Sequence, residues 1–161
     1  MPKTRYKNED AIAYAKNYCG KKSNSCGIFL EGVNKSDCAH FIAHCLQAGG
    51  ITIKNPSSDN QLCPQGLAVR NVDLVAELRR LDGLYENVKE IGLTDAIVGD
   101  IGFLDRPDRP THAFMICAPV DLRPMPPPPV KVYAHSASRC GTPMDAQWRQ
   151  WYSTIFRLTN G

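Results

Sequence analysis

The chain has 161 residues, of which 43% are hydrophobic and 22% are charged, and its formal net charge is +3. A chain of this length buries about 70% of its unfolded surface in one domain. We therefore expect a single domain over residues 1–161 that folds without needing disulfide or metal crosslinks. The basic residues form no run, so no nucleic-acid partner is expected. No 18-residue apolar run occurs and the segment from Met1 to Lys7 is not apolar, so we expect neither a membrane span nor a signal peptide.

The cysteine count is seven, which is high and odd. In an oxidising compartment six cysteines could pair and leave Cys38 as a thiol, whereas in a reducing cytosol all seven would be thiols. The sequence leaves both states open.

Three helices are predicted in the first half of the chain. The first begins at Asn8 and stops at Gly20 after an apolar face of four residues: Ala11, Ile12, Ala15 and Cys19. The second stops at Gly49 and has apolar residues at helical spacing: Cys38, Phe41, Ile42, Cys45 and Leu46. The third spans residues 71–81 and is closed by Asp82 and Gly83.

From residue 99 onward the pattern indicates strands, at residues 100–104, 112–117, 130–135 and 153–158. The connections between them are too short for crossover helices. We therefore predict an α+β fold in which the helices come first and pack on a C-terminal antiparallel sheet.

The start of the second helix is the candidate nucleophile site. Asp37 stands at the predicted N-cap, which makes Cys38 the first residue inside the helix. The helix dipole and the unbonded first-turn amides favour a thiolate at Cys38 and could hold the oxyanion that forms when sulfur attacks a carbonyl. The Asp37 carboxylate opposes this effect, so a protonated histidine nearby is needed to outweigh it.

Two histidines on consecutive predicted strands are the candidate partners of Cys38. If residues 112–117 and 130–135 form a hairpin centred near Arg123, His112 and His135 are cross-strand neighbours. A shift of the register by one residue would separate them. In this arrangement His112 takes the thiol proton and returns it to the leaving amine, and His135 orients the His112 ring.

The stretch from Asp37 to Gly50, DCAHFIAHCLQAGG, resembles the nucleophile helix of the putative amidase domain family, a branch of the NlpC-like, papain-fold cell-wall amidases and endopeptidases. Three more segments resemble that family in the same order: Tyr6 to Tyr18, Gly99 to Phe103, and Ala134 to Ser136. The sequence departs from the family at Ala39, where Ser or Thr is common, and in the proline-rich connection of residues 118–129.

This resemblance implies a papain-like fold and a cysteine amidase that cuts peptidoglycan stem peptides through a thioester. Cys38 is then the nucleophile, His112 the base and His135 the orienting residue, and no cofactor is expected. The implied partners are the peptidoglycan peptide and a cognate inhibitor or immunity protein, with the enzyme itself a monomer. The chain also resembles amidase effectors that bacteria inject into competitors, which implies synthesis in the cytoplasm and export to a periplasm or cell wall without a signal peptide.

Three other hypotheses remain open. His40 and His44 lie four residues apart on one helix, with Cys38 and Cys45 nearby, which is typical of a zinc-binding module. Against this module, the sequence has no CxxC pair, and the apolar periodicity predicts solvated histidines on another face than the two cysteines. The same fold could instead be a transferase that passes the acyl group to an amine or alcohol, or a binding domain with aromatic residues Trp148, Trp151 and Tyr152 at its surface.

Overall fold

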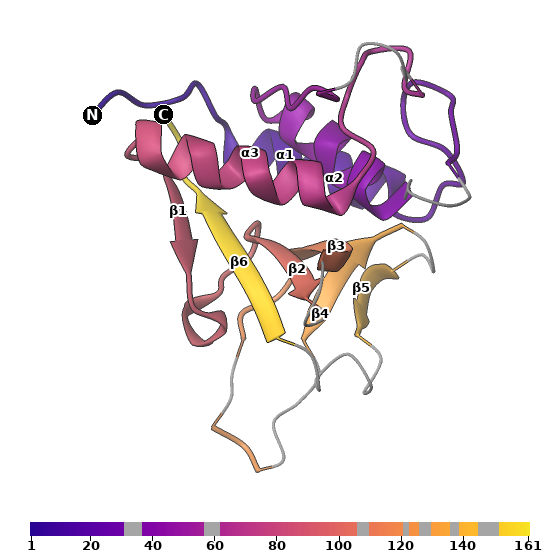
Figure 1. The fold of residues 1–161 in the computed structure, drawn as a ribbon. Helices are drawn as coiled ribbons and strands as arrows, with labels where there is room; N and C mark the ends of the chain where they lie inside the picture. Colours follow the sequence, from indigo (N-terminus) through magenta and orange to yellow (C-terminus); the bar gives the residue numbers. More distant parts are fainter. Residues whose placement is uncertain are drawn as a thin grey trace.

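Three helices cover one face of a six-stranded antiparallel sheet in the computed structural model (Figure 1). The structure describes residues 1–30, 37–56, 62–105, 110–120, 123–125, 130–135, 139–144 and 152–161. The helices are α1 (Asn8–Tyr18), α2 (Asp37–Ala48) and α3 (Asn71–Leu84), with a short 3₁₀ turn, η1, at Leu93–Asp95. The predicted α+β class is confirmed.

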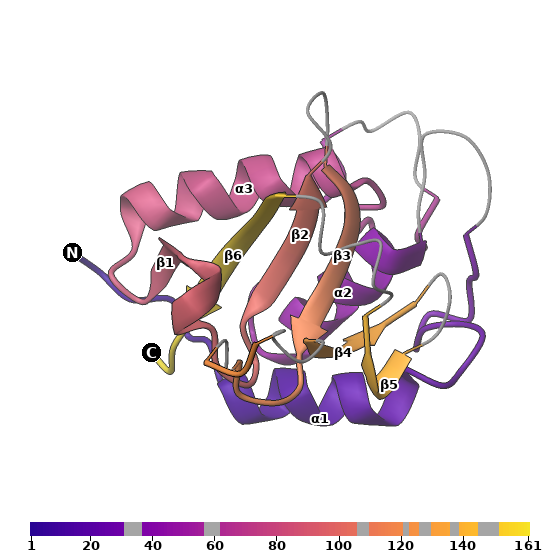
Figure 2. The ribbon, with the colours of Figure 1, turned by 90° about the horizontal axis from the view of Figure 1, so that it is seen from below.

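The sheet has the strand order β1-β6-β2-β3-β4-β5, and every neighbouring pair is antiparallel. Its strands are β1 (Val88–Ile91), β2 (Ile101–Asp105), β3 (Pro110–Ile116), β4 (Lys131–Ala134), β5 (Arg139–Pro143) and β6 (Tyr152–Leu158). Seen from the strand side, the sheet lies in front of the helices (Figure 2). The connections between strands contain no crossover helix in the described residues, as antiparallel pairing requires.

Two of the six strands, β1 and β5, were not predicted. Both are edge strands of four or five residues. Polar residues interrupt the apolar pattern of β1, and β5 contains Gly141 and ends at Pro143, which a sheet tolerates only at an edge. The third helix also runs one residue beyond Gly83, which was expected to stop it.

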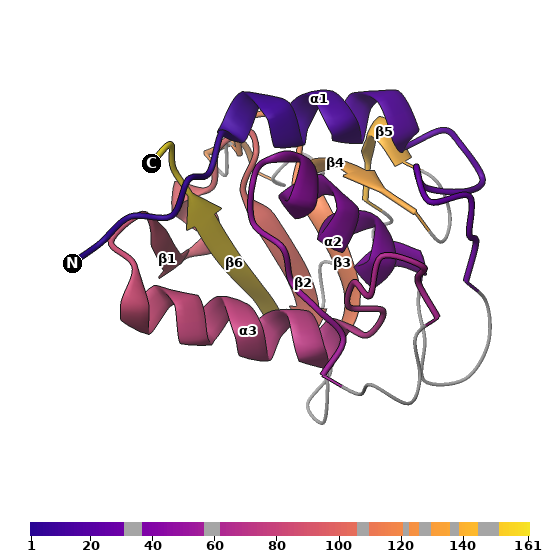
Figure 3. The same cartoon turned by 90° about the horizontal axis from the view of Figure 1, so that it is seen from above.

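Helix α2 lies over β3 and between the other two helices (Figure 3). The helix-side hydrophobic cluster joins the helices to the inner face of the sheet and includes Phe41, Phe103, Ala113, Met115 and Phe156. The outer hydrophobic cluster lies on the opposite face of the sheet and includes Leu104, Phe114, Ile116, Val132 and Ile155. Because α2 is central, ten of its twelve residues are buried.

One disulfide joins Cys19, directly after α1, to Cys140 in β5 across 121 residues of sequence. A crosslink that closes so long a loop typically contributes about 2–4 kcal/mol to stability. The other five cysteines, all within the described residues, are thiols. The structure thus matches neither of the two cysteine states considered from the sequence.

Some sequence predictions fall on parts of the chain that the structure does not describe. Trp148, Trp151 and the four prolines of residues 126–129 lie outside the described residues. Among the described residues, none of the helices has both the length and the apolar character needed to cross a membrane.

Candidate functional site

Cys38 lies in the first turn of α2 and is 1% exposed. Its Sγ atom is 3.7 Å from both Oδ1 and Nδ2 of Asn71, the first residue of α3. Two helix N-termini therefore meet at this thiol, and each directs its dipole and first-turn amides toward the same region. Asn71 was missed by sequence reasoning because nothing in its local pattern indicates that α3 begins beside α2.

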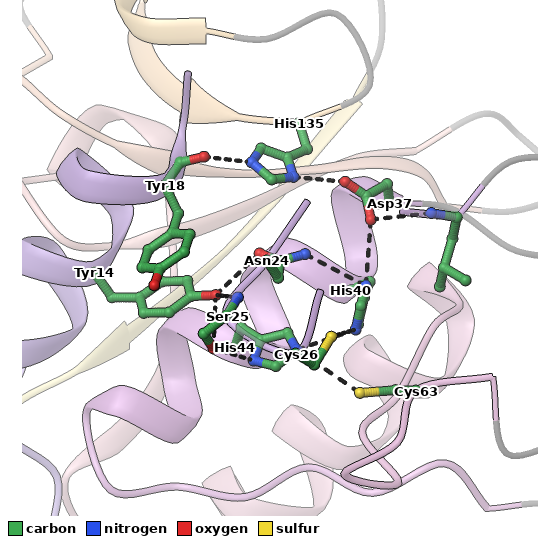
Figure 4. A network of polar contacts seen from close by, with 11 residues as sticks. Tyr14, Tyr18, Asn24, Ser25, Cys26, Asp37, His40, His44, Cys63 and His135 are labelled. Carbon is green, nitrogen blue, oxygen red and sulfur yellow. Dashed lines mark hydrogen bonds and ion pairs between the residues drawn. The ribbon is translucent and has the colours of Figure 1, made fainter. Parts of the chain in front are cut away.

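Among the described residues, Asp37 makes no helix-capping contact of the kind that its position predicts. The helix already begins at Asp37, and the described partners of its carboxylate are the backbone amide of Leu30 and the rings of His40 and His135. The side chain is fully buried, with Oδ1 3.2 Å from His40 Nδ1 and Oδ2 2.5 Å from His135 Nδ1. Asp37 is thus the centre of a buried polar network (Figure 4).

His135 bridges the ends of two helices. Its Nδ1 faces Asp37 Oδ2, and its Nε2 lies 2.6 Å from the backbone carbonyl oxygen of Tyr18, the last residue of α1. Both partners are acceptors when Asp37 is ionised, so His135 is placed to donate a hydrogen bond from either ring nitrogen.

The contacts of Asp37 with His135 and His40 offset the negative charge that Asp37 places beside Cys38. Burial alone would raise the pKa of Asp37, but the hydrogen bonds and charges of His135 and His40 outweigh burial and lower the pKa of this carboxyl. These contacts stabilise the negative charge of Asp37 next to the nucleophile position. The His135 ring also stacks on Phe41 at 4.1 Å between centroids, which fixes its plane.

The predicted strand register is wrong by one residue. Met115 pairs with Tyr133 and Ile116 with Val132, so the same register continued places Ala113, not His112, opposite His135. Successive residues of a strand point to opposite faces, and a one-residue slip reverses the face of every side chain. His112 and His135 are therefore not cross-strand neighbours, and the described partners of His135 are Asp37 and Tyr18.

His112 lies at the start of β3 and is buried. It pairs with Leu104, and its ring centroid is 6.4 Å from that of Phe114, a residue of the outer hydrophobic cluster. Cys38 belongs to the helix-side cluster. His112 lies beside the irregularity in the β2–β3 register, between Leu104 and Asp105. The pairing of Cys38 with His112 stays a prediction.

A second cluster of reactive side chains lies further along α2. His40 and His44 are both 0% exposed, so the prediction that they are solvated is wrong. His40 Nε2 is 3.1 Å from His44 Nε2 and 3.6 Å from Cys26 Sγ, and Cys63 Sγ is 3.7 Å from His44 Nε2. Figure 4 shows these four side chains pointing toward one another, and their ligand atoms all lie within 4.8 Å. We call Cys26, His40, His44 and Cys63 the Cys/His cluster.

Each cysteine of the Cys/His cluster sits in a hydrogen-bonded turn. The amide of Gly27 donates to the carbonyl of Asn24 around Cys26, and the amide of Gly66 donates to the carbonyl of Cys63. Both glycines have positive φ, +80° and +72°, a conformation that glycine adopts without strain. Burial lowers the pKa of His44 to about 4.

Residues 5–61 match the family model described as "Putative amidase domain". The predicted resemblance to this family is confirmed for this segment. The matched segment contains Cys38 and three members of the Cys/His cluster, whereas His112 and His135 lie beyond it.

Among solved structures, the chain is similar to one described as the type VI native effector-immunity complex Tae3-Tai3 from Ralstonia pickettii. The TM-score is 0.42 at 15% identity, over 96% of this chain and 100% of that chain. No curated protein matches the chain in sequence.

Proposed function

We propose that residues 1–161 form a papain-like amidase domain that hydrolyses an amide bond of peptidoglycan stem peptides, with Cys38 as the nucleophile. The main support is that the segment matched by the amidase model includes the one cysteine that lies in the first turn of α2, beside a second helix N-terminus. The other described thiols lack this position. Cys45 lies two turns further along α2, where burial raises the pKa of its thiol well above the ordinary value.

The reaction follows from the groups at this end of α2. An imidazole takes the proton of Cys38 Sγ, and the thiolate forms a bond to the carbonyl carbon of the substrate amide. First-turn amides of α2 and the Asn71 side-chain amide would donate to the resulting oxyanion. The tetrahedral species breaks its C–N bond, the imidazolium protonates the leaving amine, and water then hydrolyses the thioester with the same imidazole as base.

His112 is the proposed base, and we assign His135 a different role from the one that the sequence suggested. Both nitrogens of His135 are engaged with Asp37 and Tyr18, so this ring has no nitrogen left to orient His112. His135 instead acts as a positioning residue that holds the start of α2 through its hydrogen bond with Asp37.

The test of this function is digestion of purified peptidoglycan fragments, followed by mass spectrometry of the products. Hydrolysis adds one water across a single amide of the stem peptide and releases a new amine. If an added amine acceptor instead receives the acyl group in place of water, the transferase alternative is correct. If no stem-peptide amide is cut, the substrate assignment is wrong.

We predict that Asn71→Ala lowers the rate about 10²- to 10³-fold, the usual effect of removing one oxyanion donor. The Asn71 amide lies 3.7 Å from Cys38 Sγ, so truncation removes it from the reacting atoms. The measurement is kcat at saturating fragment concentration, with Asn87→Ala as a control for the loss of a buried asparagine far from Cys38; Asn87 bonds Thr4 and Thr159. Equal rate losses in both variants would assign Asn71 a purely structural role.

We also propose that the enzyme acts in a cell-wall compartment and is held in check by an inhibitor protein. The Cys19–Cys140 disulfide supports an oxidising destination, where such bonds persist.

A further inference from the structure

We propose that Cys26, His40, His44 and Cys63 bind one zinc ion in a closed, tetrahedral, structural site behind the nucleophile helix. This inference is independent of the proposed function, because it concerns the opposite side of α2 from the Cys38 thiol and requires no reaction. It departs from the expectation that the chain needs no metal. It also assigns different cysteines from those that the sequence suggested as partners of His40 and His44.

The spacing of the four ligand atoms fits zinc. With Zn–N bonds of about 2.0–2.1 Å and Zn–S bonds of about 2.3 Å, tetrahedral geometry requires N···N and N···S separations of about 3.3–3.6 Å. The separations here are 3.1 Å between the two Nε2 atoms and 3.6 and 3.7 Å for two of the four nitrogen–sulfur pairs, and all four ligand atoms lie within 4.8 Å of one another. Two imidazoles and two thiols also form one of the common ligand sets of structural zinc.

The outer nitrogens of both histidines are arranged as in metal sites. His40 Nδ1 lies 3.2 Å from the Asp37 carboxylate, and His44 Nδ1 lies 3.5 Å from the Ser25 hydroxyl. His40 Nδ1 also lies 3.3 Å from Asn24 Nδ2. In the tautomer that carries its proton on Nδ1, His40 would donate to Asp37 and direct the Nε2 lone pair into the Cys/His cluster. A carboxylate behind a ligating histidine fixes its tautomer and orientation.

Four protein ligands leave no open coordination position, so the proposed ion would not activate water. Its effect is to tie together three segments far apart in sequence: the turn of Asn24 to Gly27, helix α2, and the turn of Cys63 to Gly66. These short turns contribute few large apolar side chains to the core. A metal crosslink therefore explains how they are held against α2.

The same ion would be coupled to the start of α2 through an unbroken chain of contacts. His40 contacts Asp37, Asp37 contacts His135, and His135 contacts the end of α1 (Figure 4). Loss of the metal would free His40 to change its tautomer and would weaken the hold on the residue that precedes Cys38.

The first test measures metal in the full-length protein, purified from zinc-containing medium without chelator. Elemental analysis is expected to give one zinc per chain, and cobalt substitution is expected to give a tetrahedral spectrum with thiolate-to-cobalt charge transfer. The same stoichiometry is expected in Cys38→Ala, which separates this inference from the proposed catalysis. A reduced wild-type protein that contains no zinc and takes up neither Zn²⁺ nor Co²⁺ would overturn the site, as would a disulfide between Cys26 and Cys63 in place of metal.

The second test removes the ligands. The double variant Cys26→Ser/Cys63→Ser is expected to lose zinc and the charge-transfer band, whereas Cys117→Ser, a half-buried thiol at the end of β3, is the matched control and keeps one zinc per chain. Asp37→Asn should weaken zinc affinity about 10- to 100-fold, as loss of an outer-shell partner does. Retention of one zinc by the double variant would contradict the assignment.

Discussion

Replacing Cys38 with alanine is expected to abolish amide hydrolysis while leaving the fold, the disulfide and the metal content unchanged. Alanine cannot form the thioester, and no other described thiol occupies the first turn of a helix. The change removes one sulfur atom at the end of α2 and introduces a strong helix former, so its cost in stability should be about 1 kcal/mol or less. Product release from stem peptides and urea unfolding measure the two effects separately.

Cys45→Ala provides the matched control for this variant. Cys45 lies on the same helix and is equally buried, and removing its sulfur leaves a cavity of similar size. Burial raises the pKa of this thiol, so it remains protonated and unreactive. An active Cys38→Ala protein would eliminate the thiol mechanism, and equal losses of activity in both variants would indicate a packing effect instead.

The helices could be predicted because their apolar residues repeat at helical spacing and the helices are long. The nucleophile helix begins one residue before the predicted start and ends before Gly49 as predicted, and Phe41, Ile42 and Leu46 are all in the core. The same amphipathic argument failed for His40 and His44, because α2 is packed on several sides rather than one. Amphipathic periodicity identifies the face that is most apolar, but it does not show whether the polar face is also covered.

The Cys/His cluster could not be predicted from the spacing of residues in the sequence alone. Its histidines are adjacent on one helix, but its cysteines come from two turns on either side, so no CxxC pair exists. The available signal was weaker: Cys26-Gly27 and Cys63-Pro64-Gln65-Gly66 each combine a cysteine with turn residues. Such turns are common, and only the tertiary fold brings them to the same helix.

The contact of Asp37 with His135 was likewise not predicted, because the assumed strand register was wrong by one residue. The prediction made His135 the last residue of a strand over residues 130–135, whereas β4 ends at Ala134 and its register with β3 differs by one residue from the assumed one. A sheet has a side-chain period of two, so this slip moved His135 away from His112 and toward α2.

His135→Ala is expected to reduce stability by about 3–5 kcal/mol, because it leaves the buried Asp37 carboxylate without its shortest hydrogen-bond partner. His135 Nδ1 is 2.5 Å from Asp37 Oδ2 in a site where both side chains are buried, and the variant also loses the bond to the Tyr18 carbonyl. The free energy of unfolding in urea measures this loss. Adding Asp37→Asn should recover part of it, so the double variant should be more stable than the sum of the two single changes implies.

His112→Ala is the companion variant that separates positioning from proton transfer. Because His112 is the proposed base, its truncation should lower the rate of hydrolysis about 10²- to 10⁴-fold. The loss of stability should be small compared with that of His135→Ala. The opposite pattern, a folded His135→Ala protein with the larger loss of rate, would make His135 the base at the Cys38 thiol. That result would agree with its place on the helix-facing side of the sheet, and its bonds to Asp37 and Tyr18 would then have to open during the reaction.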